Sequence, residues 1–231
     1  MVTVLVSALA LTTGPSDSGF PNLVDRELVD YYERAVDAGK SGQRNKALAM
    51  LQLLLLPEET TIEVDYTGVP SSSQTAFERG VGRGLGLWQE AMQQDMPLRI
   101  VRPGRKADIL VKFVDKVAEG DARCKGEIRA KRWIQWNDQV HYQQFTAVVS
   151  VCKHADSRLM SESEITHIVA HELGHALGLG DMASTGYIMG PVELGNPFAR
   201  LNTVEVDAVK QFRSKVRDEM SRISSGTLIR G

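Results

Sequence analysis

Hydrophobic residues recur with a helical period in two neighbouring stretches near the start of the chain. One stripe of apolar positions runs through about residues 24–38 and another through about residues 44–56, with Gly39 and Gly42 between them and Pro57 after the second. Apolar residues spaced three and four apart line up on one side of a helix. The pattern predicts a helical hairpin. Because a lone hairpin cannot bury its apolar faces, we expect it to pack on the domain that follows.

Beyond Pro57 the pattern changes between strand-like and helical periods. Short runs rich in β-branched residues predict five strands, at Thr61–Tyr66, Pro97–Val101, Ala107–Val114, Ile128–Trp136 and Tyr142–Val151. Helical spacing predicts further helices at Ser72–Met92, from Ser161 onward and at Thr203–Ser221. The turn residues Asn137-Asp138 between the last two strands indicate a β-hairpin.

The start of the chain has two open interpretations. Residues 1–16 carry no charged side chain, and Val2–Leu11 is mostly apolar. The sequence Ala8-Leu9-Ala10 has the small-x-small pattern of a signal-peptidase site, which would make this stretch the tail of a secretory signal. Alternatively, it is an N-terminal strand or helix that packs on the body of the protein. A membrane-spanning helix needs about 20 residues, so we expect no stable membrane span here.

Composition and charge narrow the class of protein. Hydrophobic residues make up 42% and charged residues 24% of the 231 residues, as in soluble globular proteins. The formal net charge is -2, so we expect no nucleic-acid partner. The two cysteines, Cys124 and Cys152, are too few for a disulfide scaffold. They flank the predicted β-hairpin, and their spacing fits either one disulfide, which a secreted setting favours, or two free thiols.

The helix that begins at Ser161 carries the residues with the clearest chemistry. His171 and His175 are four residues apart, so both imidazoles lie on one helical face and can reach a single metal ion. Glu172 follows the first histidine, and its side chain can approach the coordination position where water would sit. His167 lies one turn earlier, where it either supports a ligand or has a purely structural role.

A third metal ligand is predicted a few residues beyond this helix. Gly178 can take the left-handed conformation that ends a helix, which would let the chain double back and bring Asp181 to the metal. Two imidazoles, one carboxylate and a water make a tetrahedral catalytic zinc site with an open position. Glu205, on the last predicted helix, is a rival third ligand, but the turn at Gly178 accounts for more residues.

At this point the sequence resembles a known group of enzymes. The run His171–Asp181 (HELGHALGLGD) resembles the zinc signature of the metzincin metallopeptidases, which ends on histidine or aspartate. Met189, two residues before Pro191, resembles the methionine of a matrixin Met-turn. The predicted helix with Phe77 and Trp88, together with the two strands after it, is similar to the first half of a matrixin catalytic domain.

The resemblance implies a fold and a division of the chain. It implies an α+β fold with a mixed five-stranded sheet, an active-site helix and a C-terminal helix, preceded here by the helical hairpin. Residues 1–22 would be a signal remnant and linker, residues 23–57 the hairpin, and residues 58–231 the catalytic domain. Matrixins normally use histidine as the third zinc ligand, whereas Asp181 resembles the aspartate of snapalysin-like metzincins.

The resemblance also implies a zinc-dependent endopeptidase. Zinc would be held by His171, His175 and Asp181, with Glu172 as general base. Of the five histidines, only His171 and His175 have the spacing of metal ligands, so we expect one catalytic zinc ion. Whether the protein also binds calcium stays an open question. We expect peptide or protein substrates, a monomer, and a secreted or cell-envelope location. Two alternatives stay open: a catalytically silent zinc-binding adaptor, and a zinc hydrolase of non-peptide amides. The intact Glu172 argues against the adaptor, because a structural zinc site needs no general base.

Overall fold

The architecture is taken from a computed structural model of the chain. The structure describes residues 2–6, 19–57, 59–96, 98–117, 125–136 and 141–225. The helices are α1 (Arg26–Lys40), α2 (Arg44–Gln52), α3 (Ser71–Met92), the 3₁₀ helix η1 (Gln93–Asp95), α4 (Glu162–Ala176) and α5 (Thr203–Ser224). The strands are β1 (Val2–Val6), β2 (Thr60–Asp65), β3 (Leu98–Ile100), β4 (Ile109–Val114), β5 (Gly126–Trp136), β6 (His141–Cys152), β7 (His154–Ala155) and β8 (Arg158–Leu159).

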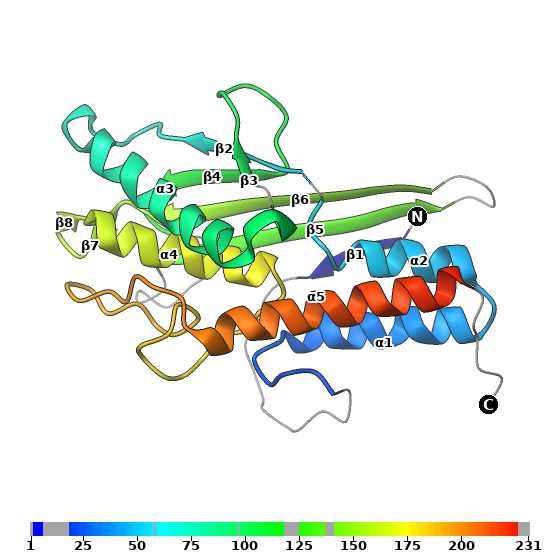
Figure 1. The fold of residues 1–231 in the computed structure, drawn as a ribbon. Coiled ribbons are helices and arrows are strands. Elements are labelled where there is room, and N and C mark those ends of the chain that lie inside the picture. Colours follow the sequence, from blue (N-terminus) through cyan, green and yellow to red (C-terminus); the bar gives the residue numbers. More distant parts are fainter. Residues whose placement is uncertain are drawn as a thin grey trace.

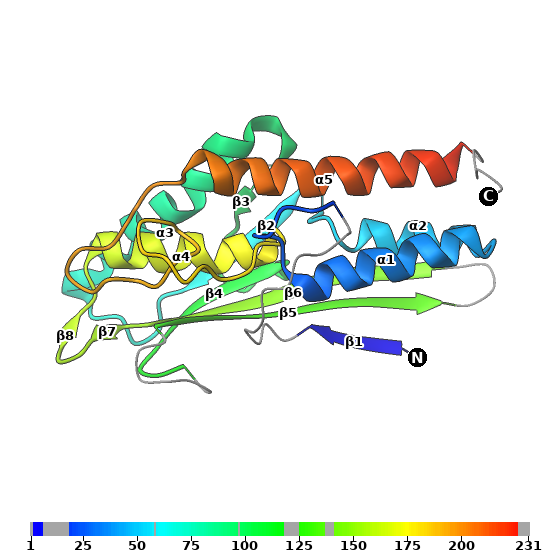
Figure 2. The ribbon, with the colours of Figure 1, turned by 90° about the horizontal axis from the view of Figure 1, so that it is seen from below.

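Within the described residues, six strands form one mixed sheet in the order β1-β5-β6-β4-β2-β3 (Figure 1). Strands β3, β2, β4 and β6 run parallel to one another, whereas β5 pairs antiparallel with β6. These five strands confirm the predicted α+β fold with its mixed sheet. Strand β1 adds a sixth, antiparallel to β5 and opposite Ala130 to Ile134 (Figure 2).

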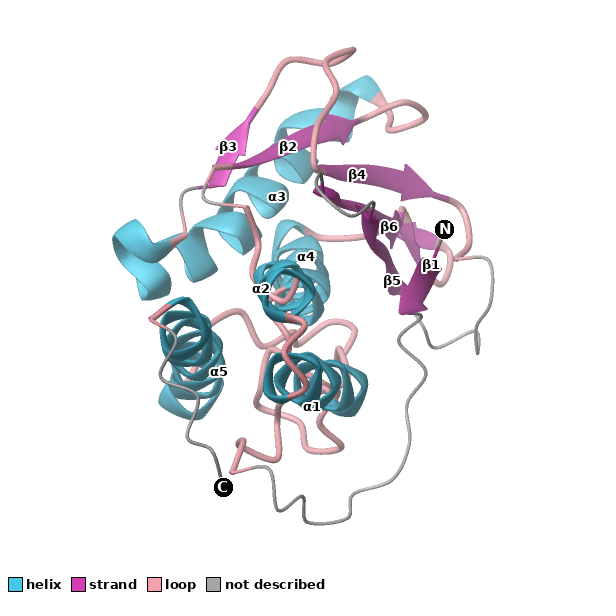
Figure 3. Cartoon of the chain, turned by 90° about the vertical axis from the view of Figure 1, so that its right-hand side faces the viewer, coloured by secondary structure: helices cyan, strands magenta, loops and turns pink. Residues whose placement is uncertain are grey.

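One face of the sheet carries the main hydrophobic core. Alternate residues of a strand point to opposite faces, and Ile62, Val111 and Val149 are buried on the same face. Helices α3 and α4 cover this face, and both contribute buried side chains to the same core (Figure 3). The indole of Trp88 in α3 donates a hydrogen bond of 2.7 Å to the carbonyl of Ala170 in α4, which fixes the two helices to each other.

A second hydrophobic core joins the two ends of the chain. Helices α1 and α2 form the predicted hairpin and pack on α5 (Figure 1). Within α5, Val209 belongs to the main core, whereas Phe212, Val216 and Ile223 pack with the hairpin. The hairpin therefore buries its apolar faces on the body of the protein, as a lone helical pair must.

The structure differs from the sequence-based prediction at the end of α2, and it bears on two expectations for the start of the chain and for membrane spans. Helix α2 ends at Gln52 rather than near Leu56, because the N–H groups of Leu54 and Leu55 bond to carbonyls three residues back instead of four. Val2–Val6 form a strand on the body, while the Ala8-Leu9-Ala10 pattern lies outside the described residues. None of the helices in the described part of the chain combines the length and apolar character needed to cross a bilayer.

Candidate metal centre

Helix α4 begins with a buried network of charge and hydrogen bonds. Ser161 and Glu164 form the capping box that their spacing predicts. The buried Glu164 carboxylate also accepts two hydrogen bonds from Arg158, at 2.6 and 2.8 Å, and one from the backbone N–H of Gly195 at 2.9 Å. Glu164 thus ties the first turn of α4 to the loop near Gly195.

Replacing Glu164 by glutamine should remove an acid-sensitive part of the stability of the fold. Hydrogen bonds from Arg158 lower the pKa of Glu164 from 4.5 to about 2, against the effect of burial. A carboxylate whose pKa falls on folding stabilises the protein fully above its unfolded pKa. This contribution is lost as the pH falls from about 4.5 toward about 2. A shift of this size corresponds to at most about 3 kcal/mol.

Urea unfolding at pH 7 and pH 3 measures this effect. The free energy of unfolding of the wild type should fall more between the two pH values than that of Glu164→Gln. Glu162→Gln is a matched control, because among the described residues its ion pairs are with the exposed guanidinium groups of Arg79 and Arg83, and surface pairs contribute about 0–1 kcal/mol. Equal pH sensitivity of the wild type and Glu164→Gln would contradict the role given to Glu164.

The two histidines of the motif are both oriented by backbone carbonyl groups. The Nδ1 atom of His171 lies 2.8 Å from the carbonyl oxygen of Ile188, and Nδ1 of His175 lies 2.8 Å from that of Leu179. Each Nδ1 therefore donates its proton to a carbonyl, which leaves Nε2 as the free ligand atom of the neutral ring. The two Nε2 atoms face each other at 3.1 Å.

Helix α4 ends in a left-handed turn at Gly178. The helix stops at Ala176, and Gly178 has a φ of +103°. The N–H of Gly178 donates to the carbonyl of His175 at 3.1 Å, and the N–H of Leu179 donates to that of Gly174 at 3.0 Å. These two hydrogen bonds form a Schellman motif, which satisfies the last carbonyls of the helix and reverses the chain direction.

The reversal brings Asp181 to the two imidazoles. Its Oδ1 atom lies 3.1 Å from Nε2 of His171 and 3.3 Å from Nε2 of His175. Tetrahedral zinc with bonds of about 2.0–2.1 Å requires ligand atoms about 3.3 Å apart, which is close to all three separations. In the part of the chain that the structure describes, this is the one group of histidine, cysteine and acidic side chains placed to hold a metal ion. The donor set and its spacing therefore fit zinc.

The charges around this group favour a cation. Burial acts to raise the pKa of Asp181, but hydrogen bonds from His171 and His175 outweigh it and lower the pKa well below its ordinary value. Burial disfavours the charged form of His175, yet the hydrogen bond to Asp181 and the charge of Glu172 outweigh burial and raise the pKa of His175 to about 9. The carboxylates of Asp181 and Glu172 thus stabilise positive charge on the imidazoles, and a cation bound by the three ligand residues would take the place of the Nε2 protons.

Glu172 of α4 is buried beside the three proposed ligand residues and packs against the start of β5. A Cβ atom at Gly126 would lie 2.4 Å from Oε1 of Glu172, so the carboxylate packs directly against this strand. Burial raises the pKa of Glu172, while the nearby charges of His171 and His175 lower it to a smaller extent. A carboxylate with a raised pKa is suited to exchange a proton near neutral pH.

Met189 packs against α4 at Gly174, the residue before His175. A Cβ atom at Gly174 would lie 2.2 Å from Sδ of Met189, so this position of α4 has room only for glycine. The N–H of Met189 donates a hydrogen bond of 2.8 Å to Oε1 of Glu205, and its carbonyl accepts one of 2.7 Å from the N–H of Met182. Met189 is therefore held by α4, by α5 and by the loop that follows Asp181.

Glu205 lies away from the histidines and supports the turn at Met189. It is fully buried, and it forms a capping box with Asn202 at the start of α5. His167 is also buried, with Nε2 3.2 Å from the carbonyl oxygen of Gly190. The sequence analysis did not find the contact between Glu205 and Met189. The N-x-x-E spacing of Asn202 and Glu205 was a signal for the cap, but not for the neighbour it holds.

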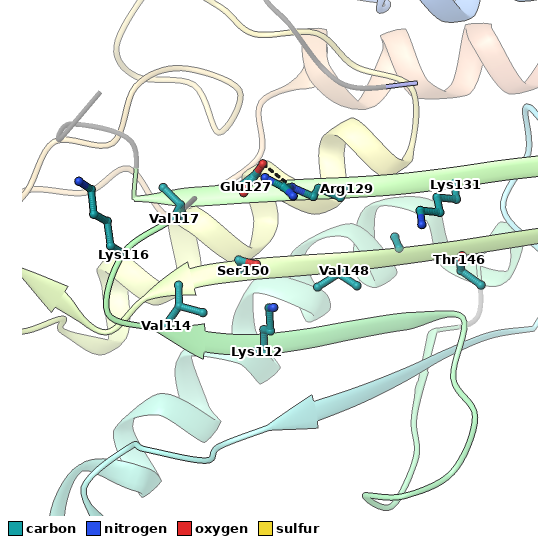
Figure 4. A pocket seen from close by; sticks show the side chains of 11 residues that line it. Lys112, Val114, Lys116, Val117, Glu127, Arg129, Lys131, Thr146, Val148 and Ser150 are labelled. Atoms are coloured by element: carbon teal, nitrogen blue, oxygen red, sulfur yellow. Dashed lines mark hydrogen bonds and ion pairs between the residues drawn. The ribbon is translucent and has the colours of Figure 1, made fainter. Parts of the chain in front are cut away.

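A separate hollow of about 380 Å³ lies on the sheet face turned away from α4 (Figure 4). It is lined by side chains of β4, β5 and β6, including Lys112 and Lys131, and the Glu127 carboxylate forms an ion pair of 2.7 Å with Arg129 at its rim.

Cys152 is buried at the end of β6. Cys124, and with it the predicted disulfide, lies outside the described residues, as does the predicted turn at Asn137-Asp138.

Comparison with known proteins places this geometry in a family. The family model of the matrixins matches residues 58–212, which include the whole sheet except β1, the helix α4 and the group of His171, His175 and Asp181. Among curated proteins, none matches the chain in sequence. The helical hairpin and the second half of α5 lie outside the matched range. Because the match covers more than half of the chain, the protein belongs to the matrixin family of metzincin peptidases and is a zinc metalloendopeptidase.

Proposed function

We propose that this enzyme hydrolyses peptide bonds at one zinc ion held by His171, His175 and Asp181. The observation that carries the proposal is the triangle of their ligand atoms, with sides of 3.1, 3.1 and 3.3 Å. The aspartate in place of the usual matrixin histidine makes this a snapalysin-like ligand set. When bound, zinc would polarise the scissile carbonyl and acidify a water molecule.

Glu172 is the general base in this proposal. Its buried carboxylate follows His171 on α4. It interacts electrostatically with the ligand residues His175 and Asp181. It accepts a proton from the attacking water and returns it to the leaving amine. Met189 lies in a turn that packs on Gly174 and is held by Glu205, and the carbonyl of Ile188 in the same turn orients the imidazole of His171.

The peptide substrate binds along the start of β5 as an added antiparallel strand. Two observations support this. Gly126, the first residue of β5, packs against Glu172, and farther along the same edge β1 pairs antiparallel with β5. Backbone hydrogen bonds to a strand edge bind peptides with little dependence on sequence. The pocket for the residue after the scissile bond would be formed by α4 and residues 190–194, which the hydrogen bond from Gly195 to Glu164 holds against the helix.

We also propose that the enzyme works outside the cytoplasm, in the secreted or cell-envelope setting typical of matrixins. Fractionation of the native host, with detection of the full-length protein by antibody, tests this. Recovery with the extracellular or envelope fraction is expected, and recovery with the cytosolic fraction would contradict it.

A mixed peptide library incubated with the protein tests the proposed activity. Three samples are compared: zinc-loaded protein, protein treated with a chelator, and chelated protein to which zinc is returned. We expect cleavage in the first and third samples, with about one zinc per chain. Zinc-loaded protein that cleaves no peptide would contradict the proposal and would favour a non-peptide amide substrate or a silent zinc-binding role.

A further inference from the structure

The short segment before α1 pairs with the turn that follows α4. The N–H of Asp25 donates to the carbonyl of Gly178 at 2.8 Å, and the N–H of Gly180 donates to the carbonyl of Leu23 at 2.8 Å. Between them, Val24 and Leu179 form an antiparallel β-bridge, and both side chains are buried. About 150 residues of chain separate the two sides. The contact therefore joins the N-terminal part of the protein to the turn Leu177–Asp181, which we call the metal loop.

This turn positions two of the three proposed zinc ligands. The carbonyl of Leu179 accepts the hydrogen bond from Nδ1 of His175, which fixes the ring and its tautomer. Gly180 directly precedes Asp181, whose Oδ1 lies 3.3 Å from Nε2 of His175. A shift of the Leu179–Gly180 backbone would therefore move Asp181 and remove the partner that orients His175.

The segment is itself firmly anchored. The Asp25 side chain caps α1 by accepting hydrogen bonds from the N–H groups of Glu27 and Leu28. Phe20 packs edge to face on Tyr32 of α1 and also contacts Phe212 of α5. These contacts belong to the second core, so the hairpin, α5 and the segment form one support beneath the metal loop (Figure 3).

We infer that the N-terminal hairpin is a permanent brace of the metal loop, with Leu23 to Asp25 as positioning residues for His175 and Asp181. The inference rests on the proposed function only in taking these two residues as zinc ligands. A loop that is ordered before the metal arrives loses less conformational freedom on binding, which raises affinity. The hairpin is thus retained in the active enzyme and is not a cover removed on activation.

Asp25→Pro tests the brace with little disturbance elsewhere. Asp25 has a φ of -57°, which proline adopts without strain, and Val24, extended in the β-bridge, can precede a proline. Proline removes the N–H that bonds Gly178 and places a ring carbon against that carbonyl. Asp25→Ala is the matched control, because it also loses the cap of α1 but keeps the N–H.

Zinc affinity is measured by competition with a chromophoric chelator. We expect Asp25→Pro to bind zinc about fivefold to tenfold more weakly than Asp25→Ala, which is the effect of one lost hydrogen bond. Val64→Ala provides a second control: it opens a cavity in the main core at β2, which is not part of the brace, and should lower the melting temperature without changing zinc affinity. Equal zinc affinity of Asp25→Pro and Asp25→Ala would overturn the inference.

Amide hydrogen exchange separates this inference from the proposed function and does not depend on a folded proline variant. In the wild type, the amides of Asp25 and Gly180 should be protected together without metal and become more protected when zinc binds. Fast exchange at Gly180 in the metal-free protein would overturn the brace even if zinc binds. Protection of both amides with no zinc binding at all would keep the brace and overturn the proposed metal centre.

Discussion

Replacing Glu172 by glutamine should lower kcat/KM for peptide cleavage about 100-fold to 10,000-fold while zinc stays bound. The amide has nearly the same shape as the carboxylate but cannot take a proton from water, and general-base catalysis contributes about that factor. Glu172 does not belong to the ligand triangle, so the metal content of the variant should equal that of the wild type. Steady-state kinetics and metal analysis on the same preparations measure both effects.

Glu162→Gln is the matched control for this variant. Glu162 lies on the same helix, ten residues before Glu172, and its carboxylate pairs with the exposed guanidinium groups of Arg79 and Arg83. We expect its removal to change kcat/KM by less than about threefold, because surface ion pairs contribute little. An active Glu172→Gln enzyme with normal zinc content would exclude Glu172 as the general base.

Replacing Asp181 by alanine should weaken zinc binding by more than about 100-fold and abolish cleavage at low zinc concentration. Loss of a partner that merely supports a ligand costs 10-fold to 100-fold in affinity, so loss of a ligand itself should cost more. Asp181→His should retain tight binding, because three imidazoles also form a tetrahedral zinc site. Chelator competition measures the affinities of the three proteins side by side.

Glu205→Gln distinguishes Asp181 from the rival ligand. The Glu205 carboxylate accepts hydrogen bonds from the N–H groups of Met189 and Asn202, so its loss should lower the melting temperature and leave about one zinc per chain. If instead Glu205→Gln loses zinc and Asp181→Ala keeps it, then Glu205 of the last helix is the third ligand.

The parts of the fold that follow from the sequence depend on local chemistry. The capping box of Ser161 and Glu164 and the left-handed Gly178 involve residues within one or two turns of each other, so their spacing alone predicted where α4 begins and ends. The alternation of apolar and polar residues in Thr61–Tyr66 likewise predicted a strand, and in β2 every second residue is indeed buried.

The parts that did not follow depend on contacts between distant segments. No spacing rule connects Leu23 with Gly180, or Met189 with Glu205, because each pair meets only after the whole domain has folded. The early end of α2 at Gln52 did not follow either, because the leucine-rich pattern continues to Leu56 while the hydrogen bonds leave the α-helical pattern at Leu54. The sequence thus predicted three residues that the fold brings together, His171, His175 and Asp181, but not the surroundings that hold them.

The most direct test of the account is anomalous diffraction at the zinc absorption edge from crystals of the zinc-loaded protein. We predict one strong peak within about 2.0–2.2 Å of Nε2 of His171, Nε2 of His175 and a carboxylate oxygen of Asp181. A peak bound by a different set of side chains, or no peak between these three residues, would contradict the proposed metal centre.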